Sequence, residues 1–261
     1  MQRTVAALDL AQNPLVCVLA QIRIAPVLSM DNFLKPIQER LRLSGYPKFQ
    51  SIEQEEIIIG PRPIARQSTR WIFIDRDGFQ GIVLSQNSIV LQVTRYSSFE
   101  DFTSRLLATL KAIGEEAKLA LVERIGLRYV NRICPETGES LDQYLQPGVL
   151  GLPGEKIGTS RGQLRFEQRG ETALGKLVVR VFQNEGADLP PGIEPLGLNL
   201  PPLEGNGGLK TILDVDHFSP LQRDFEPNAL VADMWKLHEF TDRAFRAAIT
   251  DYALNKWRKK A

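Results

Sequence analysis

The sequence predicts an α+β protein built from antiparallel sheets and two long amphipathic helices. Short segments of alternating hydrophobicity follow one another with turn sequences between them, and each half of the chain ends such a run with a long helical stripe. This order of elements favours helices packed on one face of an antiparallel sheet. The composition agrees, because 43% hydrophobic and 24% charged residues in a chain of 261 are typical of a folded protein.

The first half, residues 1–118, opens with an alternating segment, Leu15–Ile24, that reads as a strand ended by Pro26. Asp31 then caps a short helix that stops before Gly45. Four strands are predicted next, with hairpin-type turns between the last three: Ser51–Ile59, Arg70–Asp75, Phe79–Leu84 and Ser88–Arg95.

The clearest helix of the chain closes this half. Ser98 and Asp101 have the spacing of a capping box at its start. Its apolar residues recur three and four positions apart, as expected for a helix that covers a sheet. They are Phe99, Phe102, Leu106, Leu110 and Ile113.

The second half, residues 119–261, begins with a strand over Leu121–Ile133, and Ser140 opens a short helix. Pro227 and Asn228 begin the last long helix. The strands predicted between these helices are Gln163–Gln168, Leu174–Gln183 and Leu209–Asp216. An irregular Pro/Gly-rich insertion, residues 186–208, separates the last two strands, and a loop of that length is typically functional or mobile.

The two halves share one order of elements: a strand, a helix, several antiparallel strands and a long helix. We therefore expect two related halves, as in TATA-binding-protein-like or helix-grip-like folds. Because one fold hosts many functions, this architecture alone does not identify an activity.

Several segments resemble a sporadically distributed bacterial protein family of about this length. Its most distinctive signatures are matched by Tyr96–Phe102 and Leu127–Ile133, and the resemblance extends over nearly the whole chain through Arg70–Phe73, Leu213–Phe218 and Leu237–Glu239. The resemblance implies that the chain is a complete unit. That family is functionally uncharacterised, so the resemblance implies no catalytic residue.

Arginines on the predicted strand Leu121–Ile133 are the most informative polar feature. Arg124, Arg128 and Arg132 occupy alternate positions to the apolar residues, so they share one face. Neighbouring members are roughly 13 Å apart in an extended strand. Arg95, Arg70 and Arg23 lie at other strand ends or polar faces. Arginines so arranged could hold phosphates, carboxylates or an acidic partner in bidentate fashion.

A structural role is the alternative interpretation of these arginines. Sheet faces commonly carry cross-strand ion pairs, and acidic residues such as Glu123 and Glu167 could neutralise the arginines in solvent.

A metal site is a weaker possibility near the end of the chain. Asp214, Asp216, His217 and His238 are the candidate ligands. Alternation places the two aspartates on one strand face and His217 on the other, and the spacing matches no closed metal motif. We favour structural roles, with Asp216 and His217 bonding the loop before the last helix and His238 packed at its apolar side.

Charge, localisation and motifs limit the function. The formal net charge is +1, which argues against wholesale binding of nucleic acid or membrane. Cys17 and Cys134 form no Cys-x-x-Cys pair, and residues 1–13 do not read as a signal peptide, so we expect a cytoplasmic protein without membrane contact. The glycine-rich run Gly205–Gly208 precedes a predicted strand instead of opening a helix, so it does not read as a phosphate-binding loop.

These observations predict a non-enzymatic binding or assembly component without a cofactor. It would recognise a protein partner, a second copy of itself or an acidic ligand, in an accessory system such as defence. Two alternatives stay open. One is a nucleic-acid-binding subunit that uses the arginine-lined face, which the balanced charge does not favour. The other is a metal-dependent enzyme around Asp214, Asp216, His217 and His238.

Overall fold

The computed structural model describes residues 10, 13–58, 64–158, 164–184, 189–190, 192–193, 196–202 and 210–258. Its strands are β1 (Leu15–Ile24), β2 (Lys48–Ile58), β3 (Ile64–Ile74), β4 (Gln80–Leu84), β5 (Ser88–Val93), β6 (Leu121–Ile133), β7 (Arg165–Thr172), β8 (Gly175–Asn184) and β9 (Lys210–Asp224). Its helices are α1 (Leu34–Leu43), α2 (Phe99–Ala117), α3 (Pro147–Leu150), α4 (Pro227–Ala248) and α5 (Asp251–Trp257). Short 3₁₀ turns cover Met30–Phe33, Leu141–Gln143 and Gly154–Ile157.

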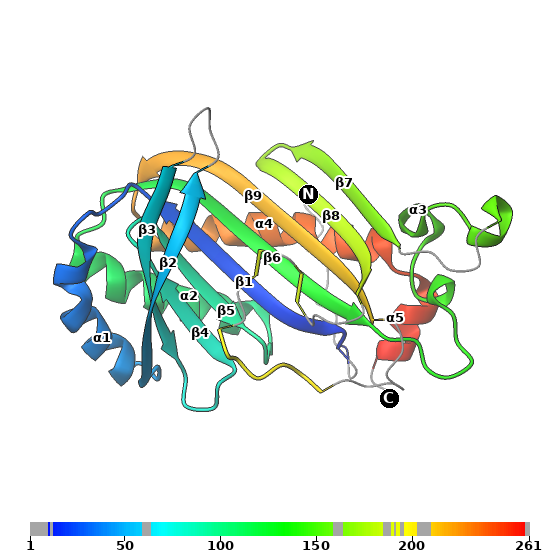
Figure 1. Cartoon of the computed structure of the whole chain (residues 1–261), viewed down its shortest axis with the longest axis horizontal. Helices are drawn as coiled ribbons and strands as arrows, with labels where there is room; N and C mark the ends of the chain where they lie inside the picture. The colour runs from blue at the N-terminus through cyan, green and yellow to red at the C-terminus, as the bar shows by residue number, and fades with distance from the viewer. Residues whose placement is uncertain are drawn as a thin grey trace.

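All of these strands join one antiparallel sheet in the order β2-β3-β4-β5-β1-β6-β9-β8-β7. The two long helices, α2 and α4, run behind the sheet in Figure 1. The α+β prediction is therefore confirmed, with an antiparallel sheet and long helices packed on one face. β1 pairs with β6 from Leu15 opposite Asn131 to Ile24 opposite Val122, so the sheet continues between residues 1–118 and 119–261.

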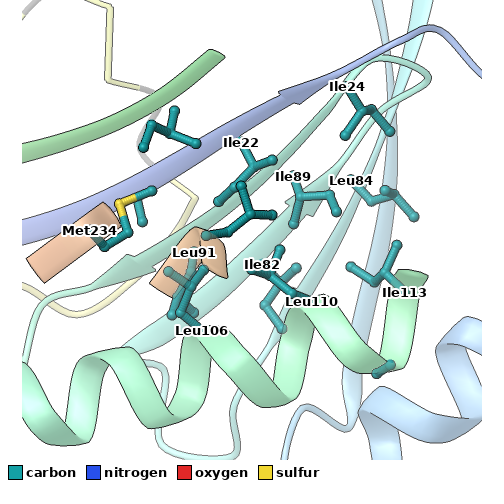
Figure 2. Packing of buried hydrophobic residues seen from close by; sticks show 14 of the residues in the cluster. Ile22, Ile24, Ile82, Leu84, Ile89, Leu91, Leu106, Leu110, Ile113 and Met234 are labelled. Atoms are coloured by element: carbon teal, nitrogen blue, oxygen red, sulfur yellow. The ribbon is translucent and has the colours of Figure 1, made fainter. Parts of the chain in front are cut away.

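The main core lies between the sheet and the helices. Alternate residues of β1, among them Ile22 and Ile24, point toward the helices and are fully buried. Figure 2 shows these side chains with those of β4 and β5 against Leu106 and Leu110 of α2 and Met234 of α4. Every member of the predicted stripe on α2 is buried, because a helix on a sheet hides one side of its surface.

The start of α2 is only partly as predicted. The hydroxyl of Ser98 accepts the backbone N–H of Asp101 at 3.1 Å, so Ser98 is the N-cap. The carboxylate of Asp101 does not complete a capping box. It accepts instead from Ser97 Oγ at 2.9 Å and Arg105 Nε at 3.0 Å.

β9 is longer than the sequence predicts. Asp216 was expected at its end, yet the strand continues to Asp224 through Pro220. Proline reads as a strand terminator because it has no N–H to donate. Pairing with β8 stops at Phe218, so Pro220 has a strand neighbour on one side only, where it faces Arg124 of β6.

The helix-free face of the sheet is crossed by part of the irregular insertion. We call its described residues, 189–190, 192–193 and 196–202, the crossing segment. Ile193 packs with residues of β1, β6 and β9, while Leu196 packs with residues of β3 and β4. The backbone N–H of Asn199 donates to Gly78 O at 2.7 Å, and Thr94 Oγ1 donates to Asn199 O at 2.6 Å. Hydrogen bonds and apolar contacts therefore fix this part of the insertion on the sheet.

The strand order is nearly symmetric about the boundary between β1 and β6. From β1 outward the neighbours are β5, β4, β3 and β2, and from β6 outward they are β9, β8 and β7, so the β1 side has one strand more. This symmetry concerns topology alone, and the relatedness of the halves stays a prediction. Within the described ranges no helix is both long and apolar enough to cross a membrane.

Candidate ligand-binding pocket

A cavity of about 380 Å³ lies on the helix-free face, beside the crossing segment. It is lined by Leu19, Gln21, Pro26, Ser68, Thr69, Arg70, Val83, Ser85, Gln86, Asn87, Ser88, Val90, Gln92, Arg124, Gly126, Arg128, Gly192, Ile193, Leu196 and Asp216. β3 and β6 both contribute although three strands separate them. Strands spaced about 4.8 Å apart would put these two roughly 19 Å from each other in a flat sheet. Their shared cavity therefore reflects curvature of the sheet.

Gly126 forms part of the floor. It lies on β6 between Arg124 and Arg128, and it pairs with Gln21 of β1 and Phe218 of β9. A Cβ built on Gly126 would lie 3.4 Å from Phe218 Cβ and 3.9 Å from Arg124 Nη2. A larger side chain would therefore project among the pocket residues, so the missing side chain leaves the floor open.

Arg124 reaches from β6 toward this open floor. Its Nη1 donates to Gln21 Oε1 at 3.1 Å, and its guanidinium carbon lies 4.1 Å from the centre of the Phe218 ring. Its Nε is buried without a hydrogen-bond partner among the described residues. Burial lowers the pKa of Arg124, and the nearby charge of Asp216 opposes this shift. The guanidinium of Arg124 is thus held by Gln21 and Phe218, and its Nε has no hydrogen-bond acceptor among the described residues.

Two more lining residues carry buried polar atoms of this kind. Gln92 on β5 is 3% exposed, and its Nε2 has no hydrogen-bond partner in the described part of the chain. Its neighbour is the thiol of Cys17, a weak acceptor. Ser68 Oγ on β3 is also buried without a partner there. Buried polar groups are nearly always hydrogen-bonded, so three such side chains around one cavity need an explanation.

Arg128 is held rigidly at the next position of the same face. Its Nε donates to Asp214 Oδ1 and its Nη2 donates to Asp214 Oδ2, both at 2.7 Å, and Asp214 is fully buried. Arg180 of β8 donates to the same carboxylate at 3.0 Å. A bidentate pair of this geometry fixes the plane of the guanidinium. The crossing segment approaches closely at Gly192, whose Cβ, if present, would lie 3.9 Å from Arg128 Nη1.

Asp216 contributes the carboxylate that lines the pocket. It pairs across the sheet with Arg128, its side chain is 17% exposed, and Arg180 Nη1 lies 3.9 Å from its Oδ2. Burial raises the pKa of Asp216, and the charge of Arg128 opposes that shift. The carboxylate accepts no hydrogen bond from the residues whose positions are described.

Of the other predicted arginines, Arg70 also lines the cavity, whereas Arg132 and Arg95 lie outside it. Arg132 is buried, and its Nη2 donates to the carbonyls of Pro201 and Pro202 at 2.7 and 2.8 Å. Arg95 is exposed, with its guanidinium carbon 3.4 Å from the centre of the Phe79 ring. The structure thus brings Arg124 and Arg128 together at one pocket, whereas Arg132 anchors the crossing segment.

The four metal candidates are not brought together. Asp214 and Asp216 belong to the helix-free face, whereas His217 faces α4, where its Nδ1 lies 3.3 Å from Leu237 O. His238 of α4 stacks on the ring of Phe99, and its Nδ1 lies 3.0 Å from the hydroxyl of Tyr129. Across the described ranges no three metal-binding side chains form a group that could hold an ion.

The structural roles predicted for two of these residues are wrong in detail. Asp216 and His217 were expected to bond the loop before the last helix, but both lie within β9. His217 Nε2 lies 2.9 Å from the hydroxyl of Thr172 on β7, so it ties two elements of the sheet together. Burial lowers the pKa of both His217 and His238.

Sequence reasoning missed the uncharged part of the pocket. Gln21, Gln92 and Gly126 interrupt strands that are otherwise apolar or arginine-bearing, and this interruption was the available signal. Their meeting with Ser68 depends on strand order, which alternation within single strands does not reveal.

No protein-family model matches the chain, and no curated protein is similar to it. The family resemblance seen in the sequence therefore stays a prediction.

Proposed function

We propose that the chain is a non-enzymatic binding protein that recognises an acidic ligand in the pocket above Gly126. One observation carries the proposal: Arg124 Nε, Gln92 Nε2 and Ser68 Oγ are buried around one cavity without partners among the described residues. An unsatisfied buried donor costs about 1–3 kcal/mol. A ligand that presents acceptor oxygens would recover that free energy.

The charge around the cavity favours an anion. Two N–H groups and a hydroxyl lack partners among the described residues, and one of them belongs to the guanidinium of Arg124. Hydrogen bonds from a charged donor to an anionic oxygen are about twice as strong as neutral ones. Among the described lining residues Arg70 and Arg128 are the other cations, with Arg128 paired to Asp214, and Asp216 is the one carboxylate.

A pocket ligand fits this geometry better than a nucleic acid does. Binding along a nucleic-acid backbone would use the predicted row of three arginines. Two of them are engaged inside the protein, Arg128 with Asp214 and Arg132 with carbonyls of the crossing segment. The lining includes no histidine, cysteine or lysine among the described residues, and binding alone accounts for the groups present.

The test is a thermal-shift titration with inorganic phosphate, sulfate, acetate and succinate, each compared with chloride at equal ionic strength. A ligand that binds only the folded state raises the melting temperature in a saturable way. We expect at least one of these anions to do so in the wild type and in the matched control Arg95→Gln, and not in Arg124→Gln. A wild type that responds to none of them, or an Arg124→Gln protein that responds fully, would contradict the proposal.

A further inference from the structure

The pocket contains a carboxylate as well as anion-binding donors. Asp216 lies on β9, one strand from β6, and its charge acts on the guanidinium of Arg124. Arg124 itself extends over Phe218, two residues along β9 from Asp216. The donor and the acceptor therefore border the same part of the floor, beside Gly126.

Among the described residues this carboxylate has no hydrogen-bond donor, so it can accept a hydrogen bond from a ligand. Its closest described cation is Arg180, at 3.9 Å, which is too long for a hydrogen bond. Arg180 makes shorter contacts with Glu167 at 2.7 Å and with Asp214 at 3.0 Å. Because the side chain of Asp216 lines the cavity, its acceptor oxygens are available there.

We infer that the recognised acid is a phosphoryl group that retains a proton, either free phosphate or a phosphate monoester, and that Asp216 selects it over fully ionised anions. This inference rests on the proposed function. An O–H of the phosphoryl group would donate to the Asp216 carboxylate while its other oxygens accept from Arg124. Sulfate has the same shape but no proton, so the carboxylate would repel it.

A phosphate monoester and sulfate differ near neutral pH in whether they carry a proton. A phosphate monoester has a second pKa of about 6, so at pH 6 about half of it carries an O–H. Sulfate carries none at that pH. The cavity of about 380 Å³ also includes apolar lining from Leu19, Val90, Ile193 and Leu196. That lining gives room for the organic part of a small monoester.

Calorimetric titration at pH 6 and constant ionic strength tests the inference with inorganic phosphate, glycerol 3-phosphate and sulfate. We expect wild type to bind a phosphoryl ligand at least about tenfold more tightly than sulfate, a difference of about 1.4 kcal/mol. Asp216→Asn should cut this preference to less than about threefold, chiefly through tighter sulfate binding. Glu171→Gln, a change of an exposed carboxylate on β7, should keep the wild-type preference.

The outcomes separate this inference from the proposed function. If sulfate and both phosphoryl ligands bind wild type equally well, acid recognition stands and selection by Asp216 is wrong. If none of them binds, this inference fails, and the proposed function stands only if acetate or succinate raises the melting temperature. Tighter binding of glycerol 3-phosphate than of phosphate supports a monoester, and equal binding supports the free ion. If Asp216→Asn does not fold, the pH dependence of sulfate binding to wild type decides, because it needs no substitution.

Discussion

At the scale of single residues, Gly126 decides whether the pocket can hold a ligand. It lies between Arg124 and Arg128 on the floor, and a Cβ there would make an ordinary contact with Phe218. We expect Gly126→Leu to abolish the thermal response to anions, since the new side chain would occupy the cavity. Its unfolding free energy should change by less than about 1 kcal/mol, as strand substitutions span that range.

Gly170→Leu is the matched control for this substitution. Gly170 lies on the edge strand β7 with open space around its Cβ position, so the same change there fills no cavity. Anion responses should match those of wild type. A Gly126→Leu protein that still binds anions would show that the ligand does not lie above this residue.

The buried pair of Arg128 and Asp214 predicts a large loss of stability. Removing one partner of a buried ion pair leaves an uncompensated charge and costs about 3–5 kcal/mol. We expect a loss of this size for Asp214→Ala in urea unfolding, because Asp214 is fully buried and accepts from both Arg128 and Arg180. Glu171→Ala, at an exposed site, should lie within about 0.5 kcal/mol of wild type. Equal stability of the two variants would contradict the assigned pairing.

The raised pKa of Asp216 predicts how sulfate binding depends on pH. Arg124, Arg128 and Arg180 favour its charged form, Asp214 opposes it, and burial is the largest cause of the upward shift. Below this pKa the carboxyl group is neutral and can donate a hydrogen bond to sulfate. Above it the carboxylate repels sulfate. Sulfate affinity measured by calorimetry should therefore fall as pH rises through the raised pKa.

Asp216→Asn should bind sulfate with little dependence on pH, because its amide does not titrate in this range. A wild-type affinity for sulfate that stays constant while pH passes through the titration of Asp216, followed by NMR, would contradict the selective role of this carboxylate.

At the scale of elements, the packing of α2 sets much of the stability. Leu106 is fully buried against the sheet, near Leu91 and Met234 (Figure 2). Leu106→Ala should lower the free energy of unfolding by about 2–5 kcal/mol through lost burial and a residual cavity. The exposed control Lys111→Ala on the same helix should change it by less than about 0.5 kcal/mol. Chemical denaturation measures both, and an unchanged Leu106→Ala would show that α2 does not pack there.

The elements differ in how far the sequence could predict them. The bounds of β1 and β6 and the buried stripe of α2 follow from local alternation and helical spacing, and each was predicted correctly. The position of the crossing segment could not be predicted from the sequence, because its hydrogen bonds to Thr94, Gly78 and Arg132 join residues far apart along the chain. The extension of β9 through Pro220 likewise depends on where β8 ends.

The candidate site was predicted only in its charged part. Period-two alternation identified Arg124 and Arg128 as neighbours on one face, and both line the pocket. The same argument included Arg132, which bonds the crossing segment instead. Gln92 and Ser68 were not predicted, because they reach the pocket through strand order and sheet curvature.

At the scale of the whole molecule, the two faces of the sheet have different structural roles. α2 and α4 cover one face and form the main core (Figure 1). The other face carries the crossing segment and the pocket, with floor residues from β5, β1, β6 and β9. Sites supported by strands are held more rigidly than sites on loops. The arrangement thus presents Arg124 and Gln92 on a fixed floor.

The central claim is that an anion accepts hydrogen bonds from Arg124 in this pocket. NMR spectra of the arginine Nε–H groups, recorded during a titration with inorganic phosphate, test it most directly. We predict a saturable shift of the Arg124 Nε–H signal, while the signal of the exposed Arg95 stays in place. An Arg124 signal that does not move as the phosphate concentration rises would contradict the claim.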